Sequence, residues 1–172
     1  MRPVEHFAVI SLPLVIYSLM RYRWLPAGHS VLVVLIATQL PDVIDKPLAW
    51  MFGIFPSGRM FAHSLVISLP ILTIGMYIAT RRGFGRPALL FSVSYLSHIA
   101  GDFYPILWLG SDYHFFPNLF WPLLAANPDR NPSFAAHAPH SLSAIVLTLS
   151  IFSLAAIYVV IGIRRNSTPQ SE

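Results

Sequence analysis

The sequence predicts an all-α membrane protein, a compact bundle of about five transmembrane helices with a long extracytoplasmic loop between the fourth and the fifth. Of the 172 residues, 55% are hydrophobic and only 10% are charged, whereas a soluble domain usually carries about 25% charged residues. The apolar residues also gather into runs that approach the roughly 20 helical residues needed to cross a bilayer. We therefore expect the chain to fold in lipid.

Five segments are the candidate spans, and they cover about residues 3–20, 27–40, 62–79, 87–109 and 140–163. The first ends in Arg21-Tyr22-Arg23-Trp24 without a small-residue cleavage site, which favours a span over a signal peptide. The second is short and runs directly into Pro41-Asp42. Pro13 and Pro70 predict kinks in the first and third spans. Residues 1–165 are expected to form a single polytopic membrane domain, and residues 166–172 a disordered tail.

The cationic residues predict how the spans are oriented. With five spans, seven of them follow spans one, three and five and share one side of the membrane, against four on the other side. The positive-inside rule then places the N-terminus outside and the C-terminus in the cytoplasm, in the inner or plasma membrane. The basic residues form no long block, so the net charge of +4 is interpreted as topology and no nucleic-acid partner is expected. The seven are Arg21, Arg23, Arg81, Arg82, Arg86, Arg164 and Arg165; the four are Arg2, Lys46, Arg59 and Arg130.

Histidines and carboxylates fall near the outer ends of these spans. His98 and Asp102 are four residues apart and would share one face of a helix inside a predicted span, where ionisable side chains are costly and usually functional. The alternative is an interhelical hydrogen-bonding pair with a packing role. Asp42 and Asp45 are bracketed by prolines and could bind a divalent ion, or they could form a polar helix end in which Lys46 neutralises Asp45.

Other histidines offer weaker signals. A helix that begins near Ser57 would place Arg59 and His63 on one face, where the cation could hold an anionic group beside a ligand. The alternative for His63 is an ordinary interfacial histidine. His137 and His140, just before the last span, could also be ligands or simply interfacial. The chain has no cysteine, so any metal must be held by His, Asp or Glu.

The order of these residues resembles the YdjM-type family of predicted membrane-bound metal-dependent hydrolases. The matching motifs are Pro41-Asp42-x-x-Asp45, an Arg followed closely by His63-Ser64-Leu65, and Ser97-His98-x-x-x-Asp102, with His6 before them and Trp121-Pro122 after them. The resemblance implies a metal set of His6, Asp42, Asp45, His63, His98 and Asp102. This chain departs from the family where it has Ser57-Gly58-Arg59 in place of His-Arg-Gly, and where Lys46 replaces a histidine that often follows the second Asp.

A second resemblance, to the type 2 phosphatidic acid phosphatases, breaks down at the reactive positions. Those enzymes carry a histidine directly after Pro-Ser-Gly, and an arginine six residues before the histidine of His-x-x-x-Asp. Here these positions are Arg59 and Ser92. A phosphohistidine mechanism is therefore not expected.

These observations favour a membrane-bound metal-dependent hydrolase that acts near the outer interface, on a lipid or lipid-linked ester or phosphoester. A His/Asp set favours zinc, with manganese or magnesium as alternatives. Asp45 or Asp102 would take the proton as catalytic base, and Arg59 would anchor an anionic head group. Membrane lipids are the expected partners.

Two other function classes remain open at this point. One is a metal-ion binding or transport protein that uses the same residues as a pathway, although the inner halves of spans three, four and five are mostly apolar. The other is a non-catalytic structural or partner-binding membrane protein. The loop of residues 110–139 is too polar and too rich in proline to span, and we expect a lid or a substrate-recognition loop on the outer face.

Overall fold

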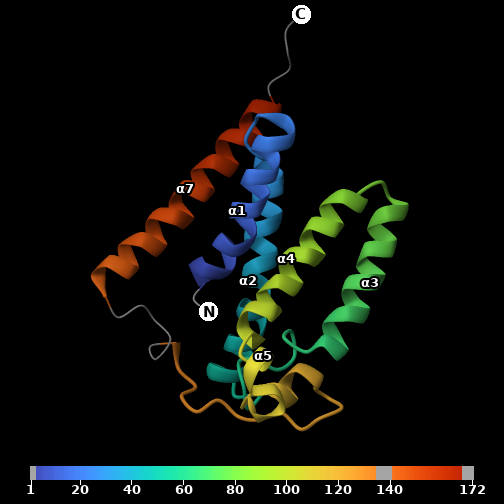
Figure 1. Ribbon diagram of the computed structural model, residues 1–172, viewed down its shortest axis with the longest axis vertical. Coiled ribbons are helices and arrows are strands. Elements are labelled where there is room, and N and C mark those ends of the chain that lie inside the picture. Colours follow the sequence, from blue (N-terminus) through green and yellow to red (C-terminus); the bar gives the residue numbers. More distant parts are fainter. Residues whose placement is uncertain (1–2, 135–140, 168–172) are drawn as a thin grey trace, which may run out of the picture.

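The computed structural model describes residues 3–134 and 141–167, with side chains described as far as residue 162. In these residues helices, and no strand, make up the regular secondary structure, which confirms the all-α prediction (Figure 1). Two short 3-10 helices, η1 and η2, lie between α5 and α7. The elements are α1 Pro3–Tyr22, α2 Gly28–Trp50, α3 Leu65–Arg81, α4 Gly85–Phe103, α5 Ile106–Leu109, η1 Gly110–Asp112, η2 Phe116–Phe120 and α7 Leu142–Ser167.

Length and apolar composition single out two of the described helices, α1 and α7, as able to cross a membrane, which is fewer than the five predicted spans. The helix α3 is apolar but shorter, with 17 residues. Large apolar side chains of α7, such as Leu149, Leu154 and Ile157, are exposed. An apolar helix whose side chains do not pack against protein presents the surface that lipid requires.

Several helix boundaries differ from the predicted segments. The helix α2 continues through Pro41 to Trp50, so both carboxylates of the Asp42–Asp45 pair lie on its last turns and face inward. The helix α4 stops at Phe103, because Pro105 cannot donate the hydrogen bond that would continue it. The tail begins later than residue 166, since α7 runs through Ser167; residues 168–172 lie outside the described part.

The segment before α3 is not the helix that was predicted to begin near Ser57. Residues 51–64 follow a series of bends and turns, and α3 starts at Leu65. Ser64 caps it, because its side chain accepts a hydrogen bond from the backbone N–H of Val66. The irregular path leaves the backbone N–H groups of this segment free to bind side chains from other helices.

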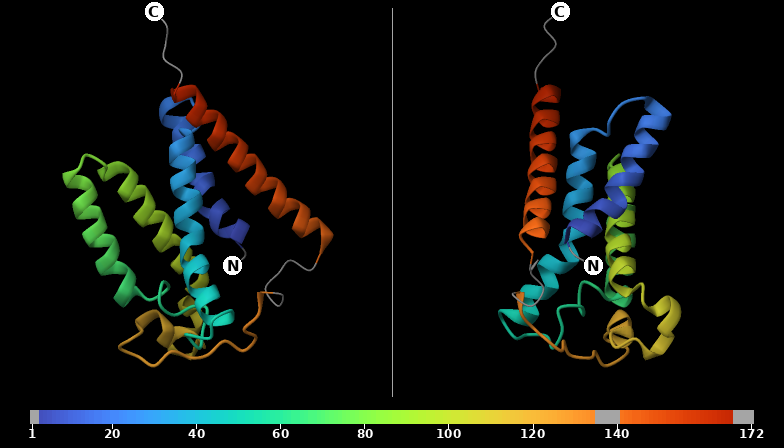
Figure 2. Two further views of the ribbon diagram at one scale, coloured as in Figure 1. Left: turned by 180° about the vertical axis from the view of Figure 1, so that it is seen from behind. Right: turned by 60° about the vertical axis from the view of Figure 1, so that its left-hand side comes forward.

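The central helix is α2, which packs against α1, α4 and α7, while α3 pairs with α4 as a hairpin (Figures 1 and 2). Gly28 and Gly162 bring α2 and α7 into backbone contact: a Cβ atom built on Gly28 would lie 3.2 Å from the Cα of Gly162. From there α7 diverges from the rest of the molecule. Two apolar cores result, one of Phe7, Val31, Val34, Ala155 and Val159, the other of Ala37, Tyr95, Ile99, Phe103 and Leu119.

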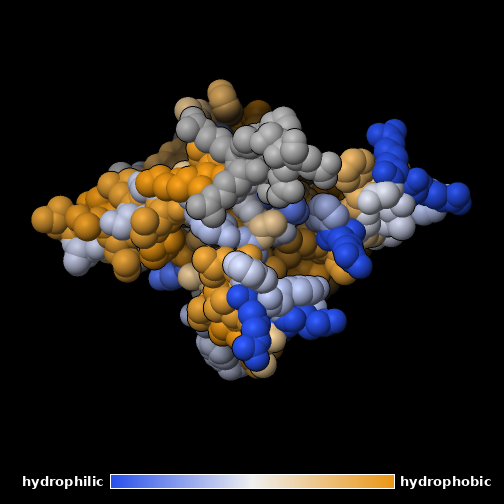
Figure 3. Space-filling view, turned by 90° about the horizontal axis from the view of Figure 1, so that it is seen from above, coloured by the Kyte–Doolittle hydropathy of each residue, from blue (hydrophilic) through white to orange (hydrophobic). Residues whose placement is uncertain are grey.

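The two ends of the molecule differ in character. The ends of α1, α3 and α7 and the start of α4 lie at one end, opposite the irregular segments that follow α2 and α4 (Figure 1). Viewed onto the first end, hydrophilic groups stand out among apolar side chains (Figure 3). The opposite end carries the polar site.

Candidate metal centre

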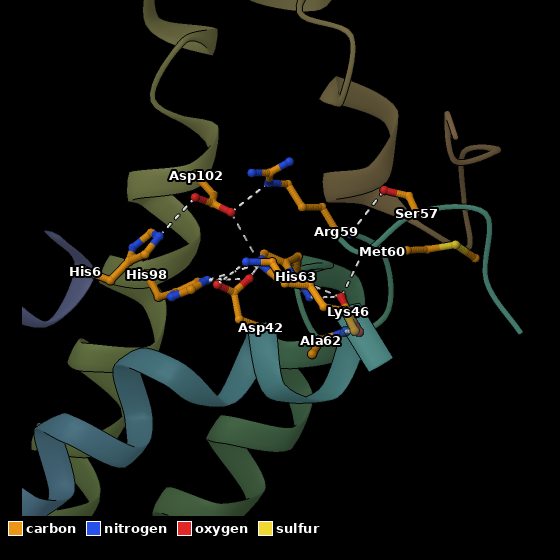
Figure 4. Close-up of polar contacts among 12 residues, drawn as sticks. His6, Asp42, Lys46, Ser57, Arg59, Met60, Ala62, His63, His98 and Asp102 are labelled. Carbon is orange, nitrogen blue, oxygen red and sulfur yellow. Dashed lines mark hydrogen bonds and ion pairs between the residues drawn. The ribbon is translucent and has the colours of Figure 1, made fainter. Parts of the chain in front are cut away.

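Four buried side chains with metal-ligating atoms meet where α2, α4 and the segment before α3 approach one another (Figure 4). Asp42 comes from α2, His63 from the turn before α3, and His98 and Asp102 from one face of α4. One ligand atom from each lies within 4.8 Å of the others. The four were all in the predicted metal set, and the fold brings them together from positions up to 60 residues apart.

The distances inside this group suit a small ion. The Nε2 of His63 lies 3.1 Å from the Nε2 of His98, 3.6 Å from Oδ1 of Asp42 and 3.6 Å from Oδ2 of Asp102. The Nε2 of His98 lies 3.7 Å from Oδ1 of Asp42. A tetrahedral zinc site with bonds of 2.0–2.1 Å requires its ligand atoms to be about 3.3 Å apart. These four separations bracket that value, and the other pairs of ligand atoms lie within 4.8 Å.

The partners of the two imidazoles determine which nitrogen faces the group. Nδ1 of His63 lies 2.9 Å from a carboxylate oxygen of Asp45, and Nδ1 of His98 lies 2.6 Å from the backbone oxygen of Thr38. Both partners can only accept, so each Nδ1 carries the hydrogen. Each neutral ring therefore presents the lone pair of its Nε2 inward, and such an outer contact to a carboxylate or carbonyl is usual for metal-ligating histidines.

With both rings neutral, the inward-facing atoms of the four side chains are therefore all hydrogen-bond acceptors. Oδ1 of Asp42 is buried and has no hydrogen-bond partner among the described residues. A buried carboxylate oxygen beside two lone pairs requires a positive charge in the middle, either a proton or a metal ion. Two imidazoles and two carboxylates are ligands that suit a divalent ion.

In the metal-free protein the proton resides on His63. Burial by itself would lower the pKa of His63, but the hydrogen bonds and negative charges of Asp102 and Asp45 outweigh it and raise the pKa to about 9. Near neutral pH the proton of this imidazolium takes the place that a cation would take. Metal binding must displace it.

Asp45 lies outside the group of four, although it was predicted to be a ligand. It is fully buried, and its two oxygens accept hydrogen bonds from the backbone N–H groups of Met60, Ala62 and His63, at 2.8 to 3.2 Å, as well as from the His63 ring. The turn before α3 thus wraps around this carboxylate. Asp45 orients His63, and with four donors on its oxygens it has little capacity left to bind an ion.

The pairing of Lys46 with Asp45 was also wrong. The Nζ of Lys46 lies 2.5 Å from Oδ2 of Asp42, because residues four apart share a helix face. This contact holds one oxygen of Asp42 and leaves Oδ1 to face the two histidines. Lys46 therefore supports Asp42 and stands outside the group of four.

His6 and Arg59 both hold Asp102. The Nε2 of His6 lies 3.0 Å from Oδ1, its ring stacks on that of His98 with centroids 3.8 Å apart, and Nε of Arg59 donates to Oδ2 at 2.7 Å. Burial alone would lower the pKa of Arg59, and the charge of Asp102 raises it above its ordinary value. Arg59 reaches the site from the irregular segment, without the shared helix face that was predicted. His6 stands beside the group of four, outside it.

Arg59 also lines a cavity of about 480 Å³ on the side of the centre that faces the loop after α4. Other lining residues are Tyr113, Phe115, Asp129 and Arg130. Asp129 accepts hydrogen bonds from Nε1 of Trp50, Oγ of Ser57 and the backbone N–H of Gly58, which ties the loop to the segment that carries Arg59.

Asp129 and Thr38 are supporting residues that the sequence did not predict. Thr38 contributes a backbone oxygen, for which side-chain pattern carries no signal. Asp129 lies in a proline-rich loop, and its partners lie more than 70 positions away in the sequence. His137 and His140 lie outside the described residues.

Comparison with known proteins identifies the family. The family model described as YdjM inner membrane protein matches residues 1–168, nearly the whole chain. No curated protein and no solved structure matches the chain. The chain belongs to the YdjM inner membrane protein family, and it is therefore a membrane protein.

Proposed function

We propose that this chain is a metal-dependent hydrolase of the inner membrane that acts near the outer interface on a lipid or lipid-linked ester or phosphoester. The observation that carries the proposal is the convergence of Asp42, His63, His98 and Asp102 on one buried point without a hydrogen-bond donor when both rings are neutral. Two imidazoles and two carboxylates favour zinc, with manganese or magnesium as alternatives.

The proposal includes a multi-pass topology of five spans in one domain of residues 1–165. The arginines that follow α1 and α3 lie at the end of the molecule where α7 terminates, opposite the metal centre (Figure 1). This arrangement agrees with cytoplasmic positive charge and an outer site. The N-terminus is then outside and the C-terminus in the cytoplasm.

The residues of the centre have three roles: binding the ion, accepting a proton and orienting the proton acceptor. Asp42, His63 and His98 would hold the ion, which would lower the pKa of a bound water molecule and polarise the scissile bond. Asp102 faces the same point and is the carboxylate placed to accept a proton, since Asp45 is engaged by its four donors. His6 and Arg59 keep Asp102 in that orientation.

A lipid substrate is supported by a second cavity, of about 290 Å³, between α1, α2 and α7. It is lined almost entirely by apolar side chains, among them Phe7, Val31 and Leu154. Phe7, which lines this cavity, is the neighbour of His6 in α1. An acyl chain lying between the diverging helices could place its ester end at the ion.

The test is the metal content of detergent-purified protein, measured by elemental analysis beside a His98→Ala/Asp102→Ala variant. Asp112→Asn, which removes an exposed carboxylate outside the group of four, is the matched control. We expect near-stoichiometric zinc or manganese in the wild type and the control, loss of it in the double variant, and hydrolysis of a panel of short-chain esters and phosphoesters that a chelator stops. Absence of metal even after soaking with divalent ions would refute the proposal. Metal uptake into proteoliposomes without hydrolysis would establish transport instead.

A further inference from the structure

The cavity of about 480 Å³ beside the centre has no role in holding the ion, yet it is joined to the centre through one side chain. Nε of Arg59 bonds Asp102, while the guanidinium lines the cavity and lies 5.1 Å from the ring centroid of Phe115. Among the described residues the terminal nitrogens of Arg59 make no hydrogen bond. A guanidinium that is held in place by a carboxylate and an aromatic ring, and whose two terminal nitrogens have no partner in the described part of the chain, is preorganised to bind an oxyanion.

The charge of the centre favours an anion only when the ion is bound. With neutral imidazoles, the three carboxylates of Asp42, Asp45 and Asp102 face the two cations Lys46 and Arg59, which leaves one net negative charge. A divalent ion changes that to one net positive charge. Electrostatics then favours binding of an anionic group between the ion and the cavity.

A second cation lines the same cavity. Arg130 is exposed and follows Asp129, whose carboxylate is taken up by Trp50, Ser57 and Gly58. These donors are neutral, so Asp129 keeps its charge, but both of its oxygens are directed to them, and it anchors the backbone on which Arg130 stands. Asp112 also lines the cavity, but it is exposed and its charge is screened by solvent. Arg59 and Arg130 are cations there that can pair with the oxygens of a doubly charged anion beside a divalent ion.

We propose that this cavity binds the phosphoryl group of the substrate, so that the enzyme acts on phosphate monoesters, with Arg59 and Arg130 as the residues that select them. The inference rests on the proposed function and narrows its substrate class. The cavity volume exceeds what one phosphoryl group needs and falls in the range of sites for small molecules, about 300–1,000 Å³. Phosphorylated lipids and soluble phosphate monoesters share this chemistry, and binding measurements with one ligand of each kind distinguish them.

The experiment is calorimetric titration of zinc-loaded, detergent-solubilised protein with three ligands: dihexanoyl phosphatidic acid, glycerol 3-phosphate and uncharged dihexanoylglycerol. We expect both phosphorylated ligands to bind if the phosphoryl group is sufficient, and only the lipid to bind if the acyl chains are also required. Either result supports the phosphoryl site, and the difference between them shows whether the ligand must also carry acyl chains. Equal binding of dihexanoylglycerol would overturn it.

Variants locate the site. Arg59→Gln should weaken binding of phosphatidic acid by at least about tenfold, the loss of one charge-assisted hydrogen bond, and Arg130→Gln should weaken it by a smaller factor. Arg82→Gln, at the opposite end of the molecule, should bind as the wild type does. Arg130 makes no contact with the group of four, so its variant tests the site even if Arg59→Gln fails to fold.

Zinc content is measured in every sample. Full zinc with no binding of either phosphorylated ligand, or with unchanged binding in both cavity variants, would reject the phosphoryl site and leave the metal-dependent hydrolase standing. Failure of the wild type to hold any metal would reject the proposed function itself.

Discussion

Replacement of Asp45 by asparagine tests whether this residue orients a ligand or is itself one. The carboxylate accepts the His63 ring N–H and three backbone N–H groups in a fully buried position. The Asp45→Asn side chain has nearly the same shape but turns one acceptor into a donor. Oδ2 accepts from three of the four donors and Oδ1 only from the N–H of Ala62, so the NH₂ group should take the place of Oδ1. The Nδ1–H of His63 is then left with a neutral amide oxygen in place of a carboxylate, which weakens the contact that fixes its tautomer.

The expected magnitude follows from these contacts. Loss of an outer contact to a ligating histidine typically lowers metal affinity about 10- to 100-fold, which corresponds to roughly 1.4–2.7 kcal/mol. The unfolding free energy should also fall by about 3 kcal/mol, because a buried backbone donor then faces the NH₂ group. Loss of a direct ligand, as in Asp42→Asn, should reduce zinc affinity further still.

The assay is competition for zinc between the protein and a fluorescent chelator, at one pH and in one detergent, beside thermal unfolding. Asp112→Asn serves as the control for a change of charge away from the centre. If Asp45→Asn kept its zinc affinity within about twofold of the wild type, the orienting role would be refuted. A loss as large as that of Asp42→Asn would make Asp45 a direct ligand.

Three further predictions concern pH, the loop and the helix contact. The proton on His63 stabilises the metal-free fold fully below pH 6.5, and this contribution is lost as pH rises through about 9. The metal-free protein should therefore melt at a lower temperature at pH 9.5 than at pH 6.5. Zinc affinity should rise over the same interval, because zinc competes with that proton. Asp129→Asn should lower the unfolding free energy by about 2 kcal/mol and leave zinc content intact, because its partners are all outside the centre; loss of zinc would contradict this. Gly28→Ala should cost about 1–3 kcal/mol, since its Cβ would lie 3.1 Å from the backbone oxygen of Val159. Gly75→Ala, where nothing lies within 4 Å of the new Cβ, should be neutral or stabilising by up to about 1 kcal/mol; equal thermal unfolding of the two variants would show that α2 and α7 are not in backbone contact.

The sequence was sufficient for the class of the protein and for most of the residues at the centre. Composition depends on the solvent in which a chain folds, so a chain with 55% hydrophobic and 10% charged residues indicates a membrane protein without knowledge of its packing. The parity of the spans placed histidines and carboxylates at one end, and the structure gathers Asp42, His63, His98 and Asp102 there. His98 and Asp102 were the simplest case, because both lie on a single helix and the spacing of four is sufficient to place them together.

Only the tertiary structure distinguished the ion-facing residues from those that support them. Asp42 and Asp45 have equivalent local sequence contexts, and helix spacing places both inward. Their roles separate because the irregular segment of residues 51–64 returns over α2 and presents three N–H groups to Asp45 alone. The same segment brings Arg59 to Asp102, 43 residues away in sequence. The path of an irregular segment depends on the distant groups that satisfy its backbone, and those groups are known only once the helices have packed.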